Sequence, residues 1–219
     1  MSPDTEEPFI TERHSMVEEQ LHHRGIYDPR VLAAMEKVPR HEFVSPGNWP
    51  EAYADRPVAI AEQQTTSQPY MIASMLQAAE IKPTDRVLEI GAGSGYQTAV
   101  LAELASEVFG IERYSTLTEE ARRVLDNLGY QNVKLVTGDG TLGLPEFAPY
   151  DVIIVSAAAP HVPPALVEQL AIGGRLVIPV GSAQQQVLEI VRKQQDGITM
   201  ECLEGCRFVP LIGQQGFAA

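Results

Sequence analysis

Residues 91–95 read GAGSG and directly follow the apolar run of residues 86–90. Glycine allows positive φ and lets the backbone approach a ligand where any Cβ would intrude. The spacing is G-x-G-x-G, whereas dinucleotide folds favour G-x-G-x-x-G for the pyrophosphate. Glu89, two residues before the first glycine, favours a ligand with a positive ammonium or sulfonium group over a pyrophosphate.

Two further acidic residues follow the next apolar runs. Glu112 ends the second run, close to where such folds place a carboxylate that accepts both ribose hydroxyls. Asp139 stands between Gly138 and Gly140 after the third run, where it could accept the exocyclic amine of an adenine. Gly-Asp-Gly by itself equally fits an ordinary turn. Together the acidic residues indicate an adenosine ligand that also carries a positive group.

The elements that must position these residues alternate along the middle of the chain. Apolar runs are found at residues 86–90, 108–111, 133–136, 151–155 and 175–179, and helical patterns at residues 96–105, 117–128 and 165–170. Continuous apolar runs indicate strands covered on both faces, so we predict an α/β fold with a doubly wound parallel sheet. Alternating segments at residues 186–194 and 198–209, separated by Asp196-Gly197, predict an antiparallel hairpin at its end.

Two helices are predicted before the sheet. The first covers residues 11–25, lies on the surface and ends at Gly25, and the second starts with Asp28-Pro29. Residues 40–66 lack any period, which predicts a long, loop-rich connection. Ser67 is predicted to cap the helix that follows it.

Composition narrows the function classes. Sixteen Lys and Arg against 29 Asp and Glu give a formal net charge of −13, so we expect no nucleic-acid partner. The acidic, polar opening and the lack of a long apolar stretch predict a cytoplasmic protein without a membrane partner. Cys202 and Cys206 lack partners at metal-ligand spacing, so we expect reduced thiols and no metal.

The glycine turn and the acidic residues, in this order on successive strands, resemble class I S-adenosylmethionine-dependent methyltransferases. The resemblance implies a Rossmann-like fold with a mostly parallel seven-stranded sheet, S-adenosyl-L-methionine as cofactor and S-adenosyl-L-homocysteine as product. Methyl transfer from sulfonium is an in-line displacement that mainly requires alignment, so no metal is demanded. The implied cofactor-binding residues are Glu89, Gly91, Gly93, Gly95, Glu112, Asp139 and Gly140.

Further segments resemble one family, the protein-L-isoaspartate O-methyltransferases, over about residues 21–211. They are QTTSQPYM at residues 64–71, VPRHEFV at 38–44, GDG at 138–140, AAAP at 157–160, GGRLVIPVG at 173–181 and RFVPL at 207–211. The resemblance implies methyl transfer to the free carboxylate of L-isoaspartyl residues in age-damaged proteins and peptides. The methyl ester then collapses to a succinimide, which reopens partly to normal aspartate.

In that family, the serine matching Ser67 hydrogen-bonds near the substrate carboxylate at the active site. A helix cap at Ser67 is compatible with this role, because a helix N-terminus also attracts anions. The carboxylate is already ionised at neutral pH, so no general base is needed. Candidate substrate-binding residues are Thr65, Thr66, Gln68 and, following the fourth strand, His161.

The chain departs from the family pattern before Gln64, where the family commonly has glycines and this sequence has Ala61, Glu62 and Gln63. Glu62 would oppose an anionic substrate if it pointed inward, and we expect it to be solvated. Arg40 and His41 are expected to have surface roles.

Three alternatives remain open. A class I methyltransferase could act on a small molecule or another acceptor such as RNA. An NAD-dependent oxidoreductase would need the G-x-G-x-x-G spacing. A non-catalytic binding module would bind the cofactor without turnover. We expect a monomer with a single domain over residues 1–219, in which residues 1–80 form the helical and substrate-loop region and residues 81–219 the Rossmann-like core.

Overall fold

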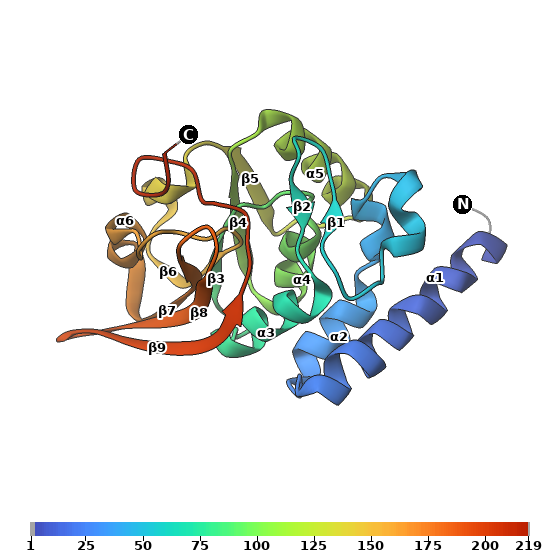
Figure 1. Ribbon diagram of the computed structural model, residues 1–219, viewed down its shortest axis with the longest axis horizontal. Helices are drawn as coiled ribbons and strands as arrows, with labels where there is room; N and C mark the ends of the chain where they lie inside the picture. Colours follow the sequence, from blue (N-terminus) through green and yellow to red (C-terminus); the bar gives the residue numbers. More distant parts are fainter. Residues whose placement is uncertain (1–2, 219) are drawn as a thin grey trace.

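Seven strands form one sheet in the order β5-β4-β3-β6-β7-β8-β9 in the computed structural model, which describes residues 3–218 (Figure 1). Pairing is parallel from β5 to β7 and antiparallel from β7 to β9. The predicted fold class is therefore confirmed, including the terminal hairpin. The strands are β3 (Arg86–Ile90), β4 (Glu107–Glu112), β5 (Val133–Thr137), β6 (Tyr150–Val155), β7 (Leu170–Gly181), β8 (Gln186–Gln194) and β9 (Gly197–Cys206).

Helices cover both faces of this sheet. Successive strand residues point to opposite faces, so Val87 and Val152 pack with α2 to α5, while Leu88 and Ile153 pack on the side of α6. The core on the first face also contains Met16, from the N-terminal region. The helices are α1 (Pro3–Ser15), α2 (Pro29–Lys37), α3 (Pro69–Ala79), α4 (Tyr96–Leu104), α5 (Ser115–Asn127) and α6 (Pro164–Glu168).

The first helix begins at Pro3, eight residues before the predicted start at residue 11, but ends at Gly25 as predicted, and the second begins at Asp28-Pro29 as predicted. A π-helical turn η1 (Met16–Leu21) and a 3-10 turn η2 (His22–Arg24) continue α1 to Gly25, which has φ 96°. The Asp28 side chain caps α2 by accepting from the backbone N–H of Arg30. The predicted surface position of the first helix holds only in part, because its apolar stripe is buried in the core.

The connection predicted as loop-rich contains short regular elements that are too brief to show a period. They are the 3-10 helices η3 (Arg40–Phe43) and η4 (Pro46–Glu51) and a small hairpin of β1 (Val58–Ala59) and β2 (Thr65–Thr66). Further 3-10 turns, η5 (Gly140–Leu142) and η6 (Pro145–Phe147), follow β5.

Two local predictions were wrong. Ser67 is not the cap of α3, because the helix begins at Pro69 and Gln68 occupies the N-cap position without a side-chain cap hydrogen bond. Arg40 and His41 are not surface residues, with 0% and 4% of their area exposed. Neighbouring groups make this burial possible, since backbone carbonyls accept from Arg40 and Phe9 stacks on His41 with ring centroids 4.0 Å apart.

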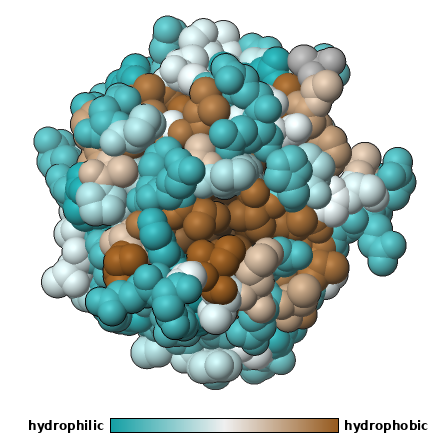
Figure 2. All heavy atoms as spheres, turned by 90° about the vertical axis from the view of Figure 1, so that its left-hand side faces the viewer, coloured by the Kyte–Doolittle hydropathy of each residue, from teal (hydrophilic) through white to brown (hydrophobic). Residues whose placement is uncertain are grey.

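The β8–β9 hairpin forms the far edge of the sheet and extends away from the N-terminal helices (Figure 1). Figure 2 shows brown apolar surface among polar side chains on the side of the molecule at the left of Figure 1. Exposed apolar residues of this part of the fold include Ile172 on β7 and Ile198, Met200 and Leu203 on β9. No helix within residues 3–218 is long and apolar enough to cross a membrane.

Candidate active site

The glycine-rich turn lies at the carboxyl end of β3, where the strand passes into α4. Gly91, Gly93 and Gly95 have φ angles of 81°, 54° and 87°. A Cβ on Gly95 would also lie 3.0 Å from the Cβ of Ala121 on α5. All three positions therefore favour glycine for their backbone conformation, and Gly95 also for close packing.

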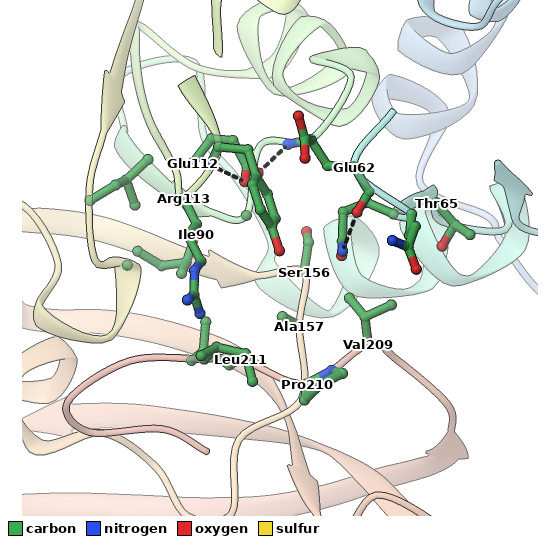
Figure 3. Close-up of a pocket in the computed structure, with 18 residues that line it drawn as sticks. Glu62, Thr65, Ile90, Glu112, Arg113, Ser156, Ala157, Val209, Pro210 and Leu211 are labelled. Atoms are coloured by element: carbon green, nitrogen blue, oxygen red, sulfur yellow. Dashed lines mark hydrogen bonds between the residues drawn. The ribbon is translucent and has the colours of Figure 1, made fainter. Parts of the chain in front are cut away.

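Glu112 lies at the end of β4, as predicted, with 7% of its area exposed. Its Oε2 accepts from the backbone N–H of Gly93 at 2.9 Å, and its Oε1 accepts from the backbone N–H of Tyr114 at 3.1 Å. Both bonds are drawn in Figure 3. A carboxylate has about four acceptor sites, so each oxygen of Glu112 can still accept from a ribose hydroxyl.

A cavity of about 420 Å³ lies over this turn and matches the size range of small-molecule sites. Gly140 contributes to its wall, and a Cβ there would lie 2.5 Å from Cγ2 of Ile90. The fixed backbone, the carboxylate with free acceptor sites and this cavity fit an adenosine cofactor. Of the predicted cofactor residues, Gly91, Gly93, Glu112 and Gly140 line the cavity, as do Glu62, Arg113, Tyr114 and Ser156.

Glu89 is placed beside this cavity, in a fully buried network. Its carboxylate accepts from Gln97 Nε2 at 2.9 Å and from Thr98 Oγ1 at 2.5 Å. Burial raises the pKa of Glu89 to about 8. Gln97 Nε2 also donates to Ser156 Oγ at 2.8 Å, so Glu89 helps to orient a serine that lines the cavity.

Neither Gln97 nor Ser156 was predicted from the sequence. Ser156 directly follows β6, and Gln97 lies in the first turn of α4. Because the carboxyl ends of parallel strands meet at one edge of the sheet, a polar residue directly after β6 was a usable signal for Ser156. Gln97 carried no comparable signal, since its partner Glu89 is identified only by the folded geometry.

Asp139 is placed differently from Glu112. Its Oδ1 accepts from the backbone N–H and the hydroxyl of Thr141, and its Oδ2 accepts from the backbone N–H of Gln214. Burial opposes ionisation, but these hydrogen bonds outweigh it and lower the pKa of Asp139. The carboxylate thus holds the C-terminal segment in place by a hydrogen bond. The contact with adenine that the sequence predicted for Asp139 stays a prediction.

A second cleft of about 910 Å³ adjoins the cofactor cavity and contains Ser67. Thr65, Ser156, Val209 and Pro210 line both spaces. Figure 3 shows Thr65, Val209 and Pro210 across the cavity from Glu112. These shared residues form the boundary at which a group can pass from one ligand to another.

Of the other residues predicted for the acceptor side, Ser67 and Gln68 line this cleft, while Thr66 and His161 do not. The hydroxyl of Ser67 has no hydrogen-bond partner among the described residues, so it is free to bind a ligand. Gln68 lines the cleft and donates to Asp55 Oδ2 at 2.8 Å. Thr66 is buried and accepts from Arg40 Nη1 at 3.3 Å. His161 is exposed and lies outside both spaces, as far as residues 3–218 define them.

The tip of the β1–β2 hairpin covers the cofactor cavity from above. Glu62 and Gln63 both have φ 56°, the left-handed conformation that glycine adopts at lower cost. Glu62 is exposed, as predicted, and its Oε1 accepts from the Thr116 hydroxyl at 2.6 Å. It lines the cofactor cavity rather than the cleft with Ser67, so it does not face the acceptor side.

Comparison with known proteins agrees with this geometry. The family model for protein-L-isoaspartate(D-aspartate) O-methyltransferase matches residues 11–216. A protein-L-isoaspartate O-methyltransferase of Koribacter versatilis is 54% identical over 210 residues, covering 96% of this chain and 95% of that protein. The corresponding enzyme of Protochlamydia amoebophila is 54% identical over 204 residues, covering 92% of this chain and 97% of that protein.

Solved structures show the same relationship. One protein-L-isoaspartate O-methyltransferase superposes with a TM-score of 0.83 at 30% identity, covering 93% of this chain and 67% of that one. A Plasmodium falciparum protein described as a putative protein-L-isoaspartate O-methyltransferase, in complex with S-adenosyl-L-homocysteine, superposes with a TM-score of 0.80 at 29% identity. The match covers 91% of this chain and 98% of that one. The chain therefore belongs to the protein-L-isoaspartate(D-aspartate) O-methyltransferase family.

Proposed function

We propose that this chain transfers the methyl group of S-adenosyl-L-methionine to the free carboxylate of L-isoaspartyl residues in damaged proteins and peptides. The observation that carries the proposal is the wall shared by the two spaces, in which Thr65, Ser156 and Pro210 line both the cofactor cavity and the cleft containing Ser67. Family membership identifies the acceptor as an isoaspartyl carboxylate.

The residues of the cofactor cavity bind and orient the methyl donor. Glu112 accepts the ribose hydroxyls, while Gly91, Gly93 and Gly140 let the ligand approach the backbone. Gly95 supports this arrangement from the start of α4. When bound, the cofactor supplies an electrophilic methyl carbon on a sulfonium centre.

On the acceptor side, Ser67 donates its hydroxyl to the substrate carboxylate and holds it near the shared wall. The start of α3 lies at the same cleft, which Gln68 and Met71 line, so the positive end of the helix dipole also favours an anion there. As a carboxylate oxygen bonds to the methyl carbon, the carbon–sulfur bond breaks and its electron pair stays on sulfur. The two opposite charges disappear together, so the protein moves no proton and contributes alignment.

We also propose that the chain works as a cytoplasmic monomer made of one domain. A single hydrophobic core that combines residues before and after position 80 supports the one-domain assignment. Described residues of one chain line both the cavity and the cleft, so a monomer contains every residue that the proposed mechanism uses. Free thiols at Cys202 and Cys206 fit a reducing compartment.

The test is a methyl-transfer assay with two peptides that are identical except that one contains L-isoaspartate and the other normal L-aspartate. With methyl-labelled S-adenosylmethionine, we expect base-labile label on the isoaspartyl peptide alone. Label on neither peptide, in protein that binds S-adenosylhomocysteine, would contradict the acceptor and favour a methyltransferase with another substrate. Failure to bind S-adenosylhomocysteine would contradict the cofactor as well.

A further inference from the structure

Arg40 is a fully buried cation directly behind the acceptor cleft. Its Nε donates to the carbonyl of Ala52 at 2.8 Å, its Nη1 to Thr66 Oγ1 at 3.3 Å and its Nη2 to the carbonyl of Ser67 at 2.7 Å. Its guanidinium carbon lies 4.6 Å from the centroid of the Tyr96 ring. One side chain therefore joins the C-cap of η4, β2 and the residue before the N-cap of α3.

The charge of Arg40 is not cancelled by a close carboxylate. No ion pair among the described residues includes Arg40. Asp55 contributes to its electrostatic surroundings without a direct bond to it: Oδ2 of Asp55 is bonded to Arg24 and Gln68, and its buried Oδ1 has no hydrogen-bond partner among the described residues. Burial lowers the pKa of Arg40, yet a guanidinium stays protonated in proteins. Neutral oxygens and an aromatic face thus surround a positive charge that burial makes costly.

The acceptors of Arg40 connect this charge to the cleft. The Ser67 carbonyl belongs to the same peptide unit as the Gln68 N–H, at the N-cap of α3. A hydrogen bond from a cation polarises that unit and makes its N–H a stronger donor. Ser67 and Gln68 both line the cleft, whereas Thr66 turns its hydroxyl back to Arg40.

We propose that Arg40 is a positioning residue for methyl transfer. It fixes the backbone of Thr66 and Ser67 so that the Ser67 hydroxyl and the start of α3 meet the acceptor, and its charge favours an anion in the cleft. The inference rests on the proposed function, because the acceptor there is a carboxylate. A local positive charge offsets the repulsion of an anionic substrate by a chain of net charge −13.

The test compares Arg40→Gln with Arg40→Lys in the full chain, using an isoaspartyl peptide and S-adenosylhomocysteine binding. We expect Arg40→Gln to lower kcat/KM roughly 30-fold or more while changing cofactor affinity less than about three-fold. Arg40→Lys keeps the charge but cannot keep all three bonds, so it should restore KM more fully than kcat.

Arg175→Gln provides the matched control for loss of a buried arginine. Arg175 donates to the carbonyls of Ala79 and Glu80 and pairs with Asp85 at 2.7 Å, at the other end of α3. This variant should lose stability, while the protein that remains folded keeps its kcat/KM. If Arg40→Gln behaves in the same way, Arg40 is structural only and the inference is overturned.

A variant at Thr66 keeps the inference testable if Arg40→Gln does not fold. Thr66→Val removes one of the three bonds of Arg40 and should lower kcat about five-fold without changing cofactor affinity. Unchanged kcat in Thr66→Val would overturn the inference. If the wild-type protein methylates no isoaspartyl peptide, the proposed function fails and the inference with it. Normal wild-type transfer with unchanged kcat/KM in Arg40→Gln overturns the inference alone.

Discussion

Two parts of the cofactor site both contain backbone with positive φ. They are the floor, formed by the glycine turn of residues 91–95 and by Glu112, and the cover, formed by Glu62 and Gln63 at the tip of the β1–β2 hairpin. In the floor, positive φ occurs at Gly91, Gly93 and Gly95. In the cover, it occurs at Glu62 and Gln63, where a side chain makes it less favourable. Glycine alone therefore accounts for the positive φ in the floor, whereas contacts with other parts of the fold must stabilise it in the cover.

Those contacts connect the cover to elements far away in the chain. The backbone N–H of Ile60 donates to the carbonyl of Gln64 and that of Gln64 to the carbonyl of Ala61, which closes the hairpin tip, and Glu62 accepts from Thr116 on α5. The hairpin then leads directly to Ser67, whose carbonyl is held by Arg40. Substitutions in the floor should consequently change cofactor affinity, while substitutions where the cover meets the cleft should change transfer.

The largest expected effect is in the floor, at Glu112. Glu112→Ala removes a carboxylate that accepts from two backbone N–H groups and faces the ribose site, so affinity for S-adenosylhomocysteine should fall about 100-fold, or about 3 kcal/mol. Calorimetric titration measures this loss. The matched control Glu119→Ala, at an exposed position of α5, should leave affinity unchanged. A loss below three-fold in Glu112→Ala would contradict the assignment of the floor.

A smaller effect should follow from the buried carboxyl of Glu89, whose pKa burial raises from 4.5 to about 8. Between these values the folded state binds the proton and the unfolded state does not, so stability is present at low pH and decreases as pH rises. The free energy of unfolding should fall by about 2 kcal/mol from pH 6 to pH 8.

Denaturant titrations of the wild type and Glu89→Gln at pH 6 and pH 8 measure this contribution. The amide cannot ionise, so the difference between the two proteins should isolate Glu89 from the other titrating groups. Parallel pH dependence in the two proteins would show that Glu89 is not the buried acid in question.

The smallest effect concerns the cover. Gln63→Gly should stabilise the fold by about 0.5 kcal/mol, because relief of the left-handed backbone exceeds the entropy cost of glycine. Glu62→Gly relieves the same backbone but loses the bond to Thr116, so it should give no gain. Thermal unfolding of the two variants makes the comparison. Destabilisation by Gln63→Gly would show that the cover is not strained at this position.

The floor could be predicted from sequence because its signals are local. The glycine spacing and the strand-terminal Glu112 were predicted from residue types, and the structure places them at one cavity. The hairpin of Val58–Ala59 with Thr65–Thr66 was missed because two-residue strands show no alternation. Arg40 was misplaced because its acceptors, Ala52, Thr66 and Ser67, are close only in the folded chain.

For Ser67, the local sequence pattern and the family resemblance pointed to different roles, and the structure agrees with the second. Its type and its position before Pro69 predicted a helix cap, but Gln68 occupies that position. The structure leaves the hydroxyl in the cleft without a partner among the described residues, as the family resemblance required but local propensity did not.

The central claim is that the floor holds the donor and Ser67 serves the acceptor, and a single-turnover measurement of Ser67→Ala tests it most directly. With saturating S-adenosylmethionine and isoaspartyl peptide, the transfer rate should fall about ten-fold or more while S-adenosylhomocysteine affinity stays within about two-fold of wild type. Equal losses of rate and cofactor affinity, or an unchanged rate, would contradict the division between donor and acceptor sides.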